Sequence, residues 1–245
     1  MSLSYAVRDS ATMLRRELRH MQRYPSMTLM IIAMPVIFLL LFVYVFGGTM
    51  GAGLGGAAAG RAVYVNFVTP GILLITVAGG ATSTAVSVAM DMTEGIVARF
   101  RTMAISRASV LTGHVTGAVI QALLSVGVVI GVAYLAGFRP TAGAAGWFAA
   151  IGVLALFIVG ITWLAVALGL ISKTAEGASN VPMPLLILPF LGSGFVPTAS
   201  MPAGLRWFAE YQPFTPVINA TRDLLFGHPA GHSVIVAIAW GAGIT

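Results

Sequence analysis

The sequence predicts an all-α integral membrane protein, and three observations lead to this prediction. Hydrophobic residues make up 58% of the 245 residues and charged residues only 8%, whereas soluble domains carry roughly 25% charged residues. The mean hydropathy is +0.95. Five stretches also have the ~20 apolar residues needed to cross a bilayer core. They are residues 27–46, 67–90, 108–137, 147–171 and 178–196.

A sixth apolar stretch, residues 233–245, reaches only roughly 20 Å as a helix at 1.5 Å per residue. We therefore expect six spans, the last of them truncated at Thr245. No long polar region or internal repeat divides the chain. Residues 1–245 are predicted to form a single transmembrane domain.

The positive charges predict the orientation of the chain. With the N-terminus inside, nine of the 13 Lys and Arg residues fall in inner segments and four in outer segments, which favours a cytoplasmic N-terminus. The basic excess is then explained by topology, and no nucleic-acid partner is expected. The start of the chain also lacks the apolar core of a cleavable signal peptide.

Two segments flank the first predicted span. Residues 3–24 place their arginines on one helical arc and their apolar residues on another, which predicts an amphipathic helix at the inner interface; a solvated basic tail is the alternative. Residues 47–61 are rich in glycine and alanine and predict a flexible connection.

The sequence argues against an enzyme. It has no cysteine and only four scattered histidines, so no metal site is expected. The single lysine, Lys173, is preceded by Ala167 and Ser172 where a phosphate-binding loop needs glycines. The chain therefore has no predicted ATPase site and no predicted catalytic residue. Leu191 to Val196 lacks the spacing of a hydrolase nucleophile elbow.

The inner segment 91–107 concentrates charge in a chain that has little elsewhere. Glu94 precedes Arg99, Arg101 and Arg107, and Phe100 adds an apolar contact. A short interfacial helix of this kind could dock into a groove on a soluble partner. An ordinary positive-inside loop is the alternative.

Several polar and small residues lie inside the predicted spans. Gly79, Ser83 and Ser87 repeat every four residues, a spacing that lets helices pack closely. Packing and interhelical hydrogen bonding are one interpretation, and a substrate path is the other. The candidate path residues are Thr76, Ser83, Gln121 and Asn180.

Prolines are concentrated near the end of the chain, where eight of the twelve lie between Pro182 and Pro229. Such a density is incompatible with one straight helix. Irregular backbone at membrane depth must be buried in protein or face water. We therefore predict a broken, re-entrant segment over residues 197–230 on the outer side, with a plain outer loop as the alternative. Arg206 and Glu210, four residues apart, could pair on one helical face.

The same region resembles the signature of ABC-2 type transporter permeases. The matching positions are Gly194, Phe195 and Pro197, then Met201 and Pro202, then Gln212, Pro213 and Thr215, and finally Arg222, Leu224, Leu225 and Gly227. The inner segment is similar to the coupling helix of this family at Glu94, Gly95, Phe100, Arg101 and Arg107, although Ala104 stands where proline is common. The similarity is greatest to the daunorubicin-resistance branch.

The resemblance implies a six-span, type V exporter-like permease in a bacterial plasma membrane. It would work as a homodimer, or as a heterodimer with a similar permease, together with two soluble ATPase subunits that bind ATP and Mg. This chain itself would bind no cofactor. Its cargo would be an amphipathic or lipidic molecule, such as a drug, polyketide or lipid, exported outward. A polysaccharide or glycolipid exporter is the alternative, and an ATP-independent channel or scaffold is the alternative from another class.

The resemblance also implies two sets of site residues. The ATPase-coupling residues would be Glu94, Gly95, Arg99, Phe100, Arg101 and Arg107. The outer gate would comprise Pro197, Pro202, Arg206, Glu210, Pro213 and Arg222, with the Arg206–Glu210 pair holding it shut.

Overall fold

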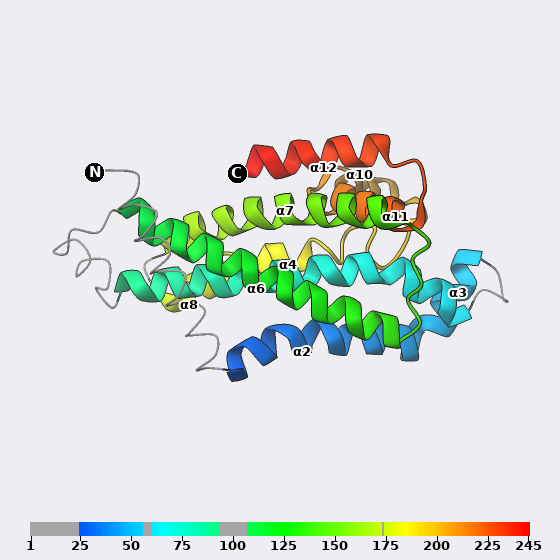
Figure 1. The fold of residues 1–245 in the computed structure, drawn as a ribbon, viewed down its shortest axis with the longest axis horizontal. Helices are drawn as coiled ribbons and strands as arrows, with labels where there is room; N and C mark the ends of the chain where they lie inside the picture. Colours follow the sequence, from blue (N-terminus) through cyan, green and yellow to red (C-terminus); the bar gives the residue numbers. More distant parts are fainter. Residues whose placement is uncertain (1–24, 56–59, 94–106, 173) are drawn as a thin grey trace.

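The computed structural model describes residues 25–55, 60–93, 107–172 and 174–245, and every regular element in these ranges is helical. The prediction of an all-α membrane protein is therefore confirmed. The longest helices run along the long axis of the molecule (Figure 1). In chain order the elements are α2 (Pro25–Leu41), the π-helical turn η1 (Phe42–Phe46), α3 (Gly47–Gly55), α4 (Gly60–Thr93), α6 (Arg107–Leu135), α7 (Ala144–Ile171), α8 (Ala175–Asn180), α9 (Met183–Ile187), the 3₁₀ turn η2 (Thr198–Ser200), α10 (Ala203–Tyr211), α11 (Phe214–Phe226) and α12 (Gly231–Ile244).

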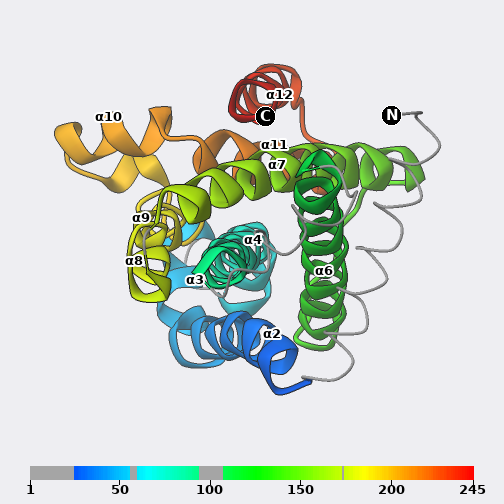
Figure 2. The same ribbon diagram turned by 90° about the vertical axis from the view of Figure 1, so that its left-hand side faces the viewer.

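Helix α4 forms the centre of the bundle, with α2, α6, α7 and α8 arranged around it (Figure 2). Of the most apolar 18 residues of α4, 67% are buried, compared with 22% for the span that contains α2 and 28% for α6. Polar side chains within it satisfy themselves locally. The hydroxyls of Thr69 and Thr76 donate to the carbonyls of Val65 and Ile72, one turn earlier. The centre of α4 can therefore be surrounded by protein without leaving these hydroxyls unpaired.

Four helices in the described ranges are long and apolar enough to cross a membrane. They cover Ile31–Leu54, Gly60–Thr93, Val115–Leu135 and Ala144–Ile171 and correspond to the first four predicted spans. At 1.5 Å per residue, the 34 residues of α4 extend over roughly 51 Å. This exceeds a hydrocarbon core of roughly 30 Å, so the ends of α4 reach the interfaces.

The fifth predicted span, 178–196, is not a continuous helix. Helix α8 ends at Asn180, α9 covers only Met183–Ile187, and turns follow as far as residue 196. Pro182, Pro184 and Pro189 lack the amide hydrogen that would continue a helix across these breaks. The last apolar helix, α12, has 14 residues, and a sixth full span stays a prediction.

Residues 47–55 are helical, so the prediction of a flexible connection over 47–61 was wrong for this part. Helix α3 continues from α2 through η1, and α4 already begins at Gly60. A Cβ atom on Gly51 would collide with the Gly60 carbonyl, so the glycines let α3 fold closely against the start of α4. The glycines of residues 47–55 thus allow close backbone packing.

The connection between α6 and α7 is tied to the elements beside it. Gly137, at φ +105°, lies in the turn that follows α6, and the Arg139 amide donates to Asn66 Oδ1 of α4 at 2.9 Å. The amides of Thr141 and Ala142 both donate to the carbonyl of Leu225, at 3.1 and 3.0 Å. This connection, α3 and α11 all lie at one end of the bundle, the α3 end (Figure 1).

Candidate functional site

The candidate site is the broken backbone between α9 and α11, which the sequence singles out by its prolines. Pro197, Pro202 and Pro213 each stand immediately before a helical element, namely η2, α10 and α11. Pro216 lies in the first turn of α11, where no intrahelical hydrogen bond is lost. The prolines therefore define where each short helix begins.

This irregular backbone reaches deep into the bundle and packs on α4. A Cβ on Gly71 would lie only 2.6 Å from the Cα of Gly194, so the two backbones are in direct contact. Gly71 is eleven residues after Gly60, roughly 16 Å along α4 from its start. Gly194 and its neighbour Ser193 are buried. Non-helical chain at this depth meets the requirement that such backbone be covered by protein.

Arg222 of α11 joins three parts of the site. Its Nη2 donates to the carbonyl oxygens of Ser193, at 2.7 Å, and Phe67, at 3.1 Å. Its Nη1 donates to Asn219 Oδ1 at 3.0 Å. The guanidinium carbon lies 4.1 Å from the centre of the Phe67 ring, a cation–π contact. One charged side chain thus connects α11 to both the broken segment and α4.

A second set of hydrogen bonds fixes the start of α11. Gln212 Oε1 accepts from the Phe214 amide at 2.9 Å, while its Nε2 donates to Thr215 Oγ1 at 2.8 Å. Thr215 Oγ1 also accepts from the Ser193 amide at 3.3 Å. A Cβ on Gly192 would lie 2.5 Å from Gln212 Nε2, so this glycine makes room for the network.

The two hydrogen-bonded groups meet at Ser193 and Asn219. The Ser193 hydroxyl donates to Asn219 Oδ1 at 2.6 Å, and the same oxygen accepts from Arg222. We call Ser193, Gln212, Thr215, Asn219 and Arg222 the re-entrant network. Their hydrogen bonds hold the broken backbone segment against α11 and α4.

Arg206 and Glu210 lie outside this network. They pair within α10 at 2.8 Å, with side chains 49% and 40% exposed. Glu210 also accepts a 3.4 Å hydrogen bond from the Thr198 hydroxyl of η2. An exposed i,i+4 pair typically contributes only about 0.3–0.5 kcal/mol. The structure therefore places the pair on the surface, while the buried contacts to α4 are made by Arg222.

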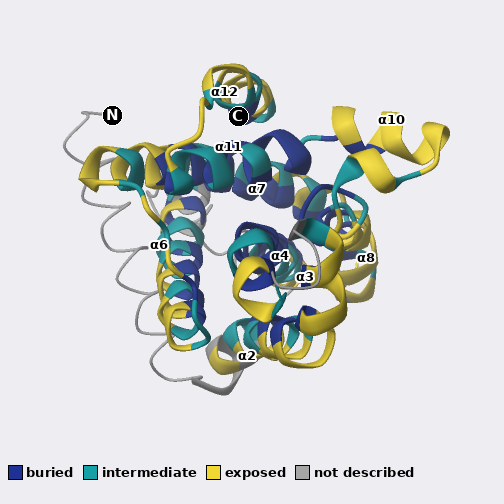
Figure 3. Cartoon of the chain, turned by 90° about the vertical axis from the view of Figure 1, so that its right-hand side faces the viewer, coloured by how far each residue is buried: buried dark blue, intermediate teal, exposed yellow. Residues whose placement is uncertain are grey.

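Helix α10 projects from the bundle with most of its residues exposed, whereas α11 is largely buried (Figure 3). Leu205, Trp207, Phe208 and Tyr211 are exposed, and the rings of Trp207 and Tyr211 lie 5.4 Å apart. Aromatic residues of this kind are enriched where a membrane meets water. The exposed face of α10 is thus suited to a membrane interface.

The candidate path residues are distributed over three helices. Thr76 is buried in α4 and donates to the Ile72 carbonyl, and Ser83 lies half-buried further along the same helix. Gln121 is half-buried on α6, and Asn180 is exposed at the end of α8. The hydrogen bonds described for these residues do not link one to another. Their role in a path stays a prediction.

The predicted coupling residues mostly fall outside the described part of the chain. Glu94, Gly95, Arg99, Phe100 and Arg101 are not described, and neither is the predicted interfacial helix 3–24. Arg107 is the first residue of α6. The coupling function of this segment stays a prediction.

Sequence reasoning overlooked part of the site. Arg222 and Pro213 were among the predicted gate residues, but Ser193 and Asn219 were not, and Gln212 and Thr215 were noted only as motif positions. The sequence could have indicated Gln212 and Thr215, because both belong to the family motif around Pro213. Ser193 and Asn219 have no comparable signal, because their contact joins residues 26 positions apart.

Comparison with known proteins identifies the family of this chain. The family model described as ABC-2 type transporter matches residues 9–226. The daunorubicin resistance ABC transporter permease protein DrrB1 of Streptomyces coeruleorubidus is 28% identical over 98% of this chain and 82% of its own length. The probable doxorubicin resistance ABC transporter permease protein DrrC of Mycobacterium tuberculosis is 26% identical over 72% of this chain and 64% of its own length. Since the family model covers most of the 245 residues of this chain, the protein belongs to the ABC-2 type transporter family.

Proposed function

We propose that this chain is the membrane-spanning subunit of an ATP-driven exporter in a bacterial plasma membrane, moving an amphipathic or lipidic molecule. Two copies of a soluble ABC ATPase subunit would bind ATP and Mg, and a second permease copy, identical or similar, would complete the path. The names of the relatives support this proposal, since they are drug-resistance permeases. The lack of a phosphate-binding loop around Lys173 agrees with a separate ATPase.

The re-entrant network is the observation that carries the proposal. A membrane segment held by side-chain hydrogen bonds can move when a few of those bonds exchange, whereas a continuous helix cannot open without losing its backbone hydrogen bonds. Arg222 contacts both the broken segment and α4, so a shift of α4 would change the hydrogen bond between Arg222 and Ser193. We propose that residues 197–230 form the outer gate and that Arg222 holds its closed position.

An apolar cavity supports an amphipathic cargo over a polysaccharide. It lies between α4, α6 and α7 with a volume of about 270 Å³. Leu73, Val126, Ile130 and Leu154 line it, and Trp147 is the one aromatic residue in its wall. Sugar-binding surfaces instead present aromatic faces beside polar groups, which this wall does not.

Reconstitution with a partner ATPase tests the proposed function. The chain would be placed in proteoliposomes with a soluble ABC ATPase subunit, and doxorubicin accumulation would be followed by fluorescence. We expect ATP hydrolysis and drug movement only when both subunits are present. Solute flux through the chain alone would instead favour an ATP-independent channel, and glycolipid transport without drug transport would favour the polysaccharide alternative.

Variants of the predicted coupling segment test how the two subunits communicate. In Glu94→Ala or Arg101→Ala, we expect ATP hydrolysis by the bound ATPase to continue while transport falls about tenfold or more. The reason is that these charges would transmit motion through a docked interfacial helix. Transport and hydrolysis would be measured in the same proteoliposomes. Unchanged transport per ATP in both variants would contradict this assignment without affecting the proposed export function.

A further inference from the structure

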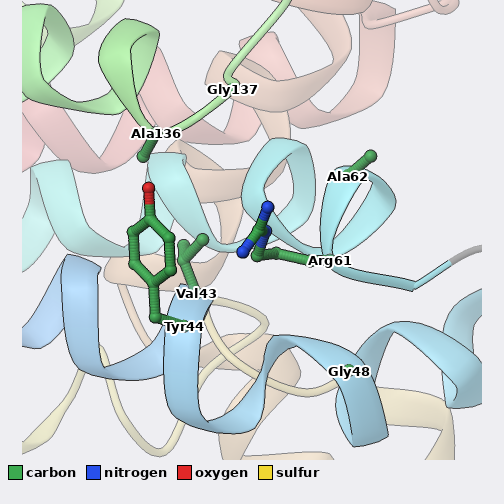
Figure 4. Close-up of a pocket in the computed structure, with 7 residues that line it drawn as sticks. All are labelled: Val43, Tyr44, Gly48, Arg61, Ala62, Ala136 and Gly137. Atoms are coloured by element: carbon green, nitrogen blue, oxygen red, sulfur yellow. The ribbon is translucent and has the colours of Figure 1, made fainter.

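A cavity at the α3 end of the bundle is separate from the re-entrant network. It has a volume of about 430 Å³ and lies between η1, the start of α4 and the end of α6. Figure 4 shows the side chains of Tyr44 and Arg61 reaching into it from two different elements. The remaining lining residues are small or apolar, namely Val43, Gly48, Ala62, Ala136 and Gly137.

Arg61 and Tyr44 are both exposed at this cavity, and two features position the arginine side chain. Its guanidinium carbon lies 4.8 Å from the centre of the Tyr44 ring, a cation–π contact. Its Cγ would be 3.1 Å from a Cβ on Gly47, so the absence of a side chain there makes room for the arginine stem. A guanidinium placed over a ring keeps its in-plane N–H groups available for an anion.

Among the residues that the structure describes, none that lines the cavity is a carboxylate. Arg61 is the one charged residue among those that line it. The ion pairs described elsewhere use Glu210 with Arg206 and Asp223 with His228. An arginine oriented toward a cavity without a carboxylate favours an external anion, and planar guanidinium donors suit phosphate oxygens.

The position of the cavity identifies where that anion would come from. Arg61 is the second residue of α4, a helix roughly 51 Å long, so α4 centred on a hydrocarbon core of roughly 30 Å would place Arg61 at headgroup depth. On α2, which precedes Tyr44 in the chain, the exposed residues Ile37, Leu40 and Leu41 lie three to seven residues before Tyr44, at helical spacing. A phosphate in the cavity would thus have an apolar strip beside it for an acyl chain.

We propose that this cavity binds the phosphate of an anionic phospholipid, with Arg61 and the Tyr44 hydroxyl as donors and the acyl chain along α2. The bound lipid joins η1, α4 and the α6–α7 connection at the α3 end. This site is independent of transport and of the identity of the cargo.

Native mass spectrometry of the purified full chain tests the proposal with phosphatidylglycerol as the probe. We expect Arg61→Gln to lower phosphatidylglycerol retention about tenfold, because the charged donor is lost. Tyr44→Phe keeps the ring and should lower retention about two- to threefold, because one neutral hydrogen bond is lost. Arg206→Gln removes the same charge from exposed α10 and should retain the lipid as the unmodified chain does. The zwitterionic phosphatidylethanolamine should bind more weakly than phosphatidylglycerol.

Two outcomes would overturn the proposal. One is equal phosphatidylglycerol retention by Arg61→Gln and the unmodified chain. The other is displacement of the lipid by an equal concentration of inorganic phosphate, which would make the site one for a free anion. Arg61→Lys guards against a folding defect, since it keeps the charge and most of the stem. It should retain more lipid than Arg61→Gln because its ammonium still attracts the phosphate, and an unchanged melting temperature in both variants would exclude a folding defect.

Discussion

Replacing Arg222 by glutamine is expected to destabilise the protein by on the order of 3 kcal/mol and to abolish transport. Arg222 is the donor to the carbonyls of Ser193 and Phe67 and to the side chain of Asn219. Hydrogen bonds to a charged group typically contribute about 1.5–3 kcal/mol each. Thermal unfolding in detergent and drug accumulation in proteoliposomes would measure the two effects.

The large effect follows from what the substitution leaves behind. The Ser193 carbonyl is in a buried turn, where it has no helical partner of its own to replace the guanidinium. A buried polar group without a partner costs about 1–3 kcal/mol. The shorter neutral amide of glutamine cannot reach both α4 and the broken segment, so the contact between Phe67 and Ser193 through one side chain is lost.

Arg206→Gln is the matched control, because it removes the same charge from the same region. Its partner Glu210 is exposed and lies in the same helix, so we expect at most about 0.5 kcal/mol of destabilisation. Arg222→Lys should be intermediate, since a single ammonium cannot reproduce the planar fork of donors. Equal stability of the Arg222→Gln and Arg206→Gln proteins would show that the re-entrant network does not hold the segment.

The sequence predicted the long helices well because their signal is local. A run of about 20 apolar residues is sufficient to identify a span, and α4 and α7 contain such runs within longer helices. The break near Pro182 and Pro189 instead falls inside the predicted fifth span, where each proline removes a backbone donor whatever surrounds it. What failed was the continuity of the fifth span, because hydropathy does not register where the chain turns.

The site was less predictable, because its contacts join positions that are distant along the chain. Arg222 donates to Phe67, 155 residues earlier, and no periodicity relates the two. The Gly/Ala-rich region shows a related limit. Low complexity suggested flexibility, yet Gly51 is a packing position against Gly60. A glycine selected for close backbone approach and one selected for freedom look the same in a single sequence.

Gly71→Ala is expected to have the second large effect, with a loss of stability of about 1–3 kcal/mol and at least tenfold slower transport. The added Cβ would lie 2.6 Å from the Cα of Gly194 and 2.7 Å from its carbonyl oxygen. Both are backbone atoms, so no side-chain rotation can relieve the overlap, and overpacking of this kind typically costs about 1–3 kcal/mol. The melting temperature and drug accumulation again provide the measurements.

Gly79→Ala in the same helix separates this clash from the general effect of adding a methyl group. Apart from its own turn of the helix, no described atom lies within 4 Å of a Cβ at Gly79, and alanine favours a helix over glycine by up to about 1 kcal/mol. We therefore expect Gly79→Ala to be neutral or slightly stabilising. Because Gly71 gains the same helical preference, any loss there must come from pushing Ser193 and Gly194 away from α4. That displacement would lengthen the hydrogen bond from Arg222 to Ser193. The double variant Gly71→Ala with Arg222→Gln should therefore lose clearly less stability than the sum of the losses in the two single variants. Additive losses would mean that the two residues hold the broken segment independently.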